Sequence, residues 1–190
     1  MNPDTHHAWI GELTAWAENN ADVVGMIGAG STGASDRPAD QFSDHDILVF
    51  TVDGAAALLR DDLSWLPETN RIIYVHVETL HGRGAIYDDG HLLEIAVLDT
   101  KELEVIRLND YVVLVDKANL SARLAAVAER TAIETTANDG NVARYGHFLQ
   151  DMIVGANRYA RGERLSGNNR IRGGATTNLL GMLGGSWGCL

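Results

Sequence analysis

Two aspartates with one residue between them stand at the start of an apolar run. Asp44 and Asp46 lead into Ile47 to Phe50, a run that is typical of a buried strand. Because successive side chains of a strand point to opposite faces, both carboxylates converge on one point at the end of that strand. Two like charges held together are costly unless a cation lies between them. Hard oxygen ligands suit Mg²⁺, so the pair predicts a metal site that also takes substrate phosphates.

A third carboxylate is expected from a neighbouring strand. Glu94 is an acid inside the apolar pattern of residues 91–97 and is the best candidate, with Asp99 as the alternative. Three such acids can hold a metal pair that clamps nucleophile and leaving group in an in-line displacement. A plain position on an open sheet face explains Glu94 as well. Alternation predicts one face with Leu92, Glu94 and Ala96, and the other with Leu93, Ile95 and Val97.

A phosphate-binding turn is predicted shortly before the aspartates. The apolar run Val23 to Ile27 leads into Gly28-Ala29-Gly30-Ser31. Glycine lets the backbone approach a phosphate closely, and exposed N–H groups there bind anions. The hydroxyl of Ser31 is a further donor to phosphate oxygens, with Thr32 as the weaker second donor. Gly30, Ser31 and Thr32 are therefore the predicted nucleotide-binding residues.

The same glycines also match a dinucleotide-binding fingerprint. Gly28, Gly30 and Gly33 have the G-x-G-x-x-G spacing, and Asp53 stands at the end of the next strand. That fingerprint requires its third glycine to open a helix that packs on the sheet. Residues 35–40 have no apolar periodicity and include a proline, and the next strand returns too soon for a crossover helix. The pattern therefore disfavours dinucleotide binding.

The elements that must position these residues form an α/β pattern. Helices are predicted over residues 5–19 and 55–63, and strands over 23–27, 47–52, 71–77, 85–87, 91–98 and 112–115. Asp88-Asp89-Gly90 predicts a hairpin with a tight primed turn. From about residue 120 the pattern is helical, over 121–133, 141–165 and 176–183. We therefore expect a domain of residues 1–117 and a helical region of residues 118–190.

Composition restricts the classes of function. The 190 residues are 45% apolar, which is enough for a core, and carry a formal net charge of −11. This charge argues against a nucleic-acid partner and suits a cationic substrate. The single cysteine, Cys189, excludes a disulfide within the chain. Neither a signal peptide nor a membrane span is predicted, so we expect a cytoplasmic protein.

The order of these motifs resembles the nucleotidyltransferase superfamily with the polymerase-β-like fold. The motifs are Gly30-Ser31, then twelve residues, then Asp44-His45-Asp46, and later Leu93-Glu94-Ile95. The run Pro38-Ala39-Asp40-Gln41-Phe42-Ser43-Asp44 is similar to enzymes of the streptomycin 6-adenylyltransferase type, which modify aminoglycosides. The resemblance covers about residues 23–98. Here a histidine replaces an apolar residue between the aspartates, and the helical part is shorter than in antibiotic-modifying relatives.

The resemblance implies a fold and an activity. The fold would be a short mixed sheet flanked by helices, followed by a helical C-terminal region. Gly30 and Ser31 would hold the triphosphate, and Asp44, Asp46 and Glu94 would be catalytic and hold two Mg²⁺ ions. The reaction would move AMP from ATP to a hydroxyl of a small, aminoglycoside-like acceptor.

Further residues have two interpretations each. Asp99 and Glu163 are candidate bases for the acceptor hydroxyl. Lys101, Arg158 and Arg161 are candidates to neutralise the triphosphate, and ordinary solvated charges explain them equally well. His45 either contacts the nucleotide or fills space.

A second hypothesis, from another class, is a non-catalytic relative. Such a module would bind a nucleotide or a partner, as in the antitoxin half of some toxin–antitoxin pairs. The three acids favour the enzyme. The short helical end favours the module, or a homodimer that shares one pocket between two chains.

Overall fold

The computed structural model describes residues 3–33, 44–138 and 141–184. The chain divides into two compact units, Met1–Ala132 and Ile133–Leu190. The boundary near residue 117 that the sequence predicts falls just before helix α4 (Ser121–Asn138), and it stays a prediction. No described helix is both long and apolar enough to span a membrane.

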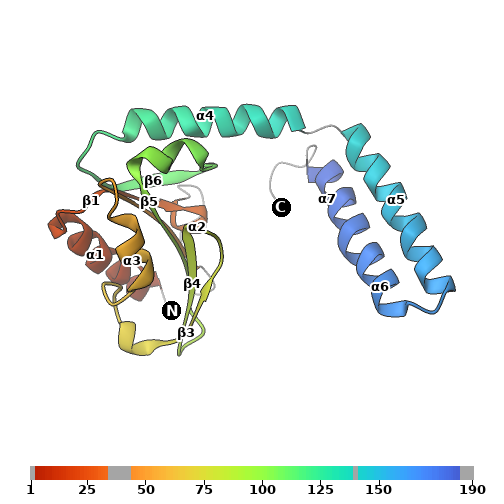
Figure 1. The fold of residues 1–190 in the computed structure, drawn as a ribbon, viewed down its shortest axis with the longest axis horizontal. Helices are drawn as coiled ribbons and strands as arrows, with labels where there is room; N and C mark the ends of the chain where they lie inside the picture. Colours follow the sequence, from red (N-terminus) through yellow and green to blue (C-terminus); the bar gives the residue numbers. More distant parts are fainter. Residues whose placement is uncertain (1–2, 34–43, 139–140, 185–190) are drawn as a thin grey trace. The chain divides into compact units, whose positions relative to one another are not determined.

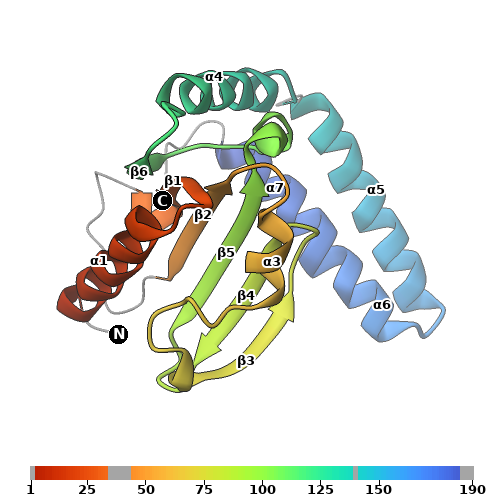
Figure 2. The ribbon, with the colours of Figure 1, turned by 60° about the vertical axis from the view of Figure 1, so that its left-hand side comes forward.

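The first unit is built on a mixed sheet that helices cover (Figures 1 and 2). Its elements before α4 are α1 (Pro3–Asn19), β1 (Val23–Ala29), α2 (Gly30–Gly33), β2 (His45–Thr51), α3 (Ala56–Asp61), η1 (Thr69–Arg71), β3 (Ile72–Val77), β4 (Gly82–Tyr87), β5 (Leu92–Asp99), η2 (Thr100–Val105) and β6 (Tyr111–Asp116). The strand order is β3-β4-β5-β2-β1-β6. The pair β2–β5 is parallel, and the other neighbouring pairs are antiparallel. The mixed α/β class expected from the sequence is confirmed.

Two apolar clusters cover the two faces of the sheet. Figure 1 shows α1 and α3 on the same side of it. The first cluster lies between these helices and the sheet and includes Trp9, Leu13, Met26, Val49, Leu93, Ile95 and Val97. The second cluster includes Ile27, Phe50, Leu98, Leu103, Leu120, Leu124 and Val127, with Leu48 and Ala96 packed against it. Leu93, Ile95 and Val97 belong to the first cluster, whereas Ala96 packs against the second, on the opposite face. This confirms the alternation predicted for β5.

The β4–β5 hairpin is confirmed, but the predicted turn type is wrong. The amide of Tyr87 donates to the carbonyl of His91 at 2.9 Å, and the amide of Gly90 donates to the carbonyl of Tyr87 at 3.0 Å. Gly90 has φ +81°, whereas neither aspartate of the turn has a positive φ. Three loop residues leave one position in the left-handed region, which glycine occupies, so a two-residue primed turn does not form.

The second unit is a helical hairpin. After the last residues of α4 it contains α5 (Asn141–Ala160), α6 (Arg164–Asn169), the π-helical segment η3 (Arg170–Ala175) and α7 (Thr176–Gly184). The single helix predicted over residues 141–165 is wrong at its end, because the chain turns at Gly162 with φ +83°. Glycines seven residues apart let the two arms approach closely. A Cβ on Gly167, Gly174 or Gly181 would clash with Tyr159, Asp151 or Arg144, respectively.

Asp99 anchors the loop after β2. Its carboxylate accepts hydrogen bonds from the Thr51 hydroxyl at 2.9 Å, the Gly54 amide at 2.9 Å and the Ala56 amide at 3.1 Å. Burial acts to raise the pKa of Asp99, but these hydrogen bonds outweigh burial and lower it. At about 3.3 Å per residue, Asp99 lies roughly 17 Å along β5 from Glu94. The alternative roles predicted for Asp99, third acid or base, are therefore wrong, because its carboxylate caps this loop.

We expect Asp99→Ala to lower the free energy of unfolding by about 2–3 kcal/mol, because it leaves the buried Ala56 amide and the partly buried Gly54 amide without an acceptor. Urea denaturation at pH 7 measures the change. The matched control is Asp53→Ala, which removes an exposed carboxylate 3.9 Å from Lys101 and should change stability by less than about 0.5 kcal/mol. Equal losses in the two variants would contradict the capping role.

Candidate active site

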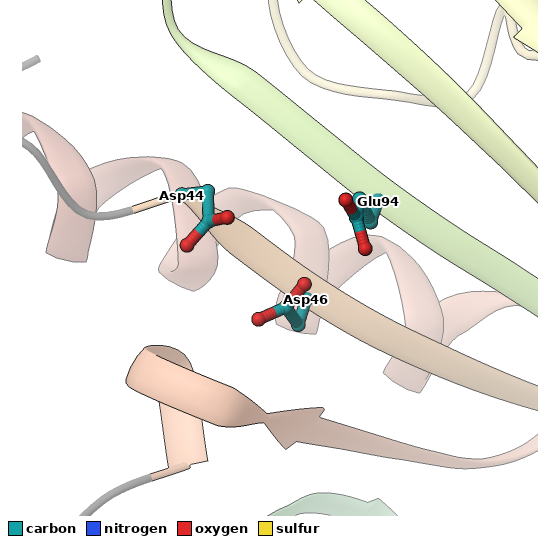
Figure 3. Close-up of side chains that lie close together, drawn as sticks. All are labelled: Asp44, Asp46 and Glu94. Atoms are coloured by element: carbon teal, nitrogen blue, oxygen red, sulfur yellow. The ribbon is translucent and has the colours of Figure 1, made fainter. Parts of the chain in front are cut away.

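Three carboxylates come together where β2 and β5 begin. Asp44 immediately precedes β2, and Asp46 lies directly opposite Glu94 in the parallel register. Figure 3 shows the three side chains grouped at the two neighbouring strands. One oxygen from each carboxylate lies within 4.8 Å of the others. This spacing lets one cation contact all three.

The acids share a face because of strand alternation and register. Asp46 is on the face opposite its neighbours His45 and Ile47, which are buried on the side of α1. Parallel pairing then puts Glu94 beside Asp46, since directly paired residues point to the same side of the sheet. The second apolar cluster includes Phe50 and Leu98 near the other end of these strands. The acids thus lie on a part of this face that borders a groove.

Electrostatics explain why this cluster suits a cation. Burial raises the pKa of Asp46 to about 6, and the negative charges of Asp44, Glu94 and Glu78 add to the rise. Burial, Glu78 and Asp44 likewise raise the pKa of Glu94. Both shifts reflect the difficulty of ionising neighbouring carboxylates in a partly dry site. A cation between them relieves that repulsion, and an all-oxygen donor set fits Mg²⁺.

Glu78 is a fourth acid at the site, which the sequence analysis missed. It follows β3 and lines a groove of about 330 Å³ together with Asp46 and Glu94. It lies in the turn between β3 and β4, where a charged residue is ordinary and gives no signal in the sequence. Only the order β3-β4-β5-β2 brings this turn beside the acids.

The glycine turn lies against the aspartates. Ala29, the last residue of β1, pairs with Asp46, and α2 begins at the next residue. Gly30 has φ +53°, and a Cβ there would clash with the carboxylate of Asp46. Both facts require glycine at this position. Ser31 follows within α2, and the run 38–43 that carried part of the family resemblance lies outside the described residues.

Thr32 ties the turn to the start of β2. Its hydroxyl donates to the carbonyl of Asp44 at 3.4 Å and accepts from the amide of Asp46 at 3.3 Å. The side chain thus holds the backbone on which the aspartates are mounted. Its predicted contact with phosphate, like those of Gly30 and Ser31, stays a prediction.

The strand direction excludes the dinucleotide-binding alternative. A Rossmann fingerprint lies between parallel strands joined by a crossover helix. Here β1 and β2 are antiparallel neighbours, with Gly28 opposite Ile47. The spacing of glycines in the sequence is therefore coincidental.

His45 points away from the acids. It is fully buried, with the ring of His6 stacked at 3.7 Å and that of Trp9 at 4.4 Å between centroids. Its Nδ1 lies 2.5 Å from Nε2 of His91. Burial, reinforced by His6 and His91, lowers the pKa of His45 to about 3, so the ring is neutral. Of its two predicted roles, space filling is confirmed and a nucleotide contact is wrong.

The remaining charged candidates have local partners. Lys101 follows the far end of β5 and lies 3.6 Å from Asp99. Glu163 belongs to the helical unit and pairs with Arg161 at 3.0 Å and with Arg158 at 4.0 Å. Lys101 therefore lies away from the acid cluster. The roles of Glu163, Arg158 and Arg161 in catalysis stay predictions.

Fold and site together define an α/β protein with a carboxylate cluster at the start of two parallel strands. No family model matches the chain, and no curated protein matches it. Among solved structures it is similar to an aminoglycoside 6-adenyltransferase from Bacillus subtilis, with a TM-score of 0.40 and 16% identity. The alignment covers 92% of this chain and 64% of that chain, so the chain spans less than two thirds of that protein.

We expect Asp46→Asn to stabilise the ion-free protein at pH 7.5. The folded-state pKa of about 6 exceeds the ordinary value of 3.8, so ionised Asp46 destabilises the fold above pH 6. The gain should be about 1 kcal/mol, because solvent screening reduces the full effect at a half-buried group. It should vanish below about pH 3, where the folded and unfolded forms are both largely protonated. Thermal denaturation in a chelator measures it.

The control for this experiment is Glu12→Gln, which changes an exposed acid on α1 and should leave stability unaltered at both pH values. Added Mg²⁺ should raise the melting temperature of the wild type and leave that of Asp46→Asn unchanged. Equal stabilisation of both proteins by Mg²⁺ would contradict a metal site at Asp46.

Proposed function

We propose that this protein is a magnesium-dependent nucleotidyltransferase that transfers AMP from ATP to a hydroxyl of a small acceptor. The observation that carries the proposal is the cluster of Asp44, Asp46 and Glu94 beside a glycine turn. The cluster offers oxygen ligands for a cation, and the turn lies where substrate phosphates would meet that cation. This pairing suits phosphoryl-type transfer, in which catalysis is mainly positioning and charge neutralisation.

The three carboxylates would hold Mg²⁺, which neutralises charge at the reacting phosphate. Backbone N–H groups at Gly30 and Ser31 would bind phosphate oxygens, while Thr32 holds the turn against β2. The acceptor oxygen forms a bond to the α-phosphorus, the bond to the bridging oxygen breaks, pyrophosphate leaves, and a base takes the hydroxyl proton. Attack and departure are in line. With pyrophosphate on the side of the turn, the acceptor would approach over β5 and β4.

The acceptor class follows from charge. Glu78 and Glu94 line the groove on the acceptor side, and the chain carries a net charge of −11. These charges favour a cationic acceptor, which an acidic site attracts and orients. The motif resemblance makes aminoglycosides the first acceptors to test. A non-catalytic module would have no use for an intact acid cluster, and this favours the enzyme.

The proposal is tested by calorimetric titration of ATP in Mg²⁺, followed by an assay of AMP transfer. We expect Mg²⁺-dependent binding that Asp44→Asn/Asp46→Asn weakens by at least about 100-fold, since both carboxylate ligands lose their charge. The matched control is Glu12→Gln/Glu18→Gln, which removes two exposed acids from α1. ATP with α-phosphate label, mixed with a panel of aminoglycosides, should yield labelled acceptor and pyrophosphate.

ATP binding that the double substitution leaves unchanged would contradict the proposed site. Tight Mg²⁺–ATP binding without AMP transfer to any small alcohol or protein acceptor would favour the non-catalytic alternative.

A further inference from the structure

A row of paired residues crosses the sheet at the level of the acids. Asp46 on β2 pairs with Glu94 on β5, Glu94 pairs with Gly84 on β4, and Gly84 pairs with His76 on β3. Figure 2 shows these strands side by side. Directly opposed residues of antiparallel strands carry their side chains on one face, with Cβ positions about 4.5–5.5 Å apart. His76 is therefore on the acid face, separated from Glu94 only by a glycine.

Gly84 lets the His76 ring lie across β4. A Cβ on Gly84 would clash with Cε1 of His76 and would lie 2.6 Å from its Nε2. Nδ1 would lie 2.9 Å from the same Cβ, so the Cε1 end of the imidazole, with a nitrogen on each side, covers the position that any other side chain would occupy. Glycine inside a strand commonly marks such a close approach. Because Gly84 has no side chain, the ring of His76 can lie over β4, on the side of β5.

The surroundings of the ring indicate which nitrogen is the donor. Tyr74 stacks on it, with centroids 5.9 Å apart and an interplanar angle of 21°. Nδ1 of His76 is buried and has no hydrogen-bond partner within the described part of the chain. A buried N–H without a partner is rarer than a bare acceptor, so we assign the ring N–H to Nε2. Nε2–H is then the hydrogen-bond donor of the ring.

Glu94 needs such a donor to act as a metal ligand. One oxygen of each carboxylate belongs to the cluster, and Glu94 also shares a side-chain hydrogen bond with Asp46. The second oxygen of a carboxylate ligand can accept a further hydrogen bond. Carboxylate ligands of metals are held in orientation by hydrogen bonds to that second oxygen. His76 is close enough to Glu94 that a positive charge on the ring would lower the pKa of Glu94, whereas burial, Glu78 and Asp44 raise it.

We infer that His76 is a positioning residue for Glu94: when a cation is held at the cluster, Nε2–H donates to the outer carboxylate oxygen of Glu94 and directs the other oxygen at the cation, across the gap that Gly84 leaves. The inference rests on the proposed function, because it assumes a cation at the carboxylate cluster. It assigns His76 and Gly84 a role that neither the motif pattern nor the acid cluster reveals.

The test compares Mn²⁺ affinities of the full chain, measured by electron paramagnetic resonance of free Mn²⁺. His76→Phe keeps a ring without a donor, and Gly84→Ala displaces the imidazole. Each should weaken Mn²⁺ binding by about 10- to 100-fold. His76→Gln keeps an amide donor near the place of Nε2 and should bind like the wild type. His147→Gln and Gly146→Ala, at exposed positions of α5, are the matched controls.

A double-mutant cycle separates positioning from general damage to the strand. In a His76→Ala background, Gly84→Ala has no ring to displace, so it should cause no further loss of Mn²⁺ affinity. Independent, additive losses would overturn the inference. In the transfer assay, His76→Phe should lower kcat and leave KM for the acceptor unchanged, since His76 contacts Glu94 and not the acceptor.

The outcomes distinguish the inference from the proposal beneath it. Mn²⁺ binding that Asp46→Asn abolishes but His76→Phe and Gly84→Ala leave intact would overturn the role of His76 alone. Equal losses in His76→Gln and His76→Phe would also overturn it, because the donor would not matter. No Mn²⁺ binding by the wild type would overturn the metal site, and the role of His76 with it.

Discussion

The mutual repulsion of Asp44, Asp46 and Glu94 is the constraint that the rest of the first unit accommodates. Burial and, beyond it, the charges of the neighbouring acids raise the pKa of Asp46, so ionising these carboxylates together costs free energy. Apolar clusters on both faces of the sheet hold β2 and β5 in register against that repulsion. The arrangement is thus unfavourable for the ion-free fold and favourable for a cation, which is common where a binding site is built on a stable scaffold.

The opposite face of β2 supplies the rigidity. His45 and Ile47, the neighbours of Asp46, are buried beneath α1 among the rings of His6 and Trp9. Because a strand cannot turn one side chain outward without turning its neighbours inward, this packing also fixes the direction of the acids. Burial of apolar and neutral groups on one face therefore determines the charge arrangement on the other.

Two glycines shape the acid face from opposite sides. Gly30, on the side of β1, makes room for the carboxylate of Asp46, and Gly84, on the side of β3, makes room for the ring of His76. In both places the missing Cβ admits a polar group that a larger residue would exclude. The site is consequently defined by absent side chains as much as by the acids themselves.

The sequence by itself determined what depends on local periodicity. Alternation placed Asp44 and Asp46 on one face and separated the two sides of β5. The apolar runs and the glycines between them located the strands and the turn that flank the aspartates. The physical reason is that a strand repeats every two residues whatever lies beside it. The mixed α/β class followed from these runs and from the helical pattern after residue 120.

Only the tertiary structure decided what depends on which strands pair and in what register. The order β3-β4-β5-β2 brought Glu78 and His76 to the acids, although each looks like an ordinary strand or turn residue in the sequence. Strand pairing also placed Asp99 at the far end of β5, where it accepts hydrogen bonds from the loop after β2. The antiparallel pairing of β1 and β2 showed that the glycine spacing does not mark a dinucleotide-binding site. Such contacts join residues far apart in the chain, and no local pattern encodes them, because pairing is selected by the packing of the whole core.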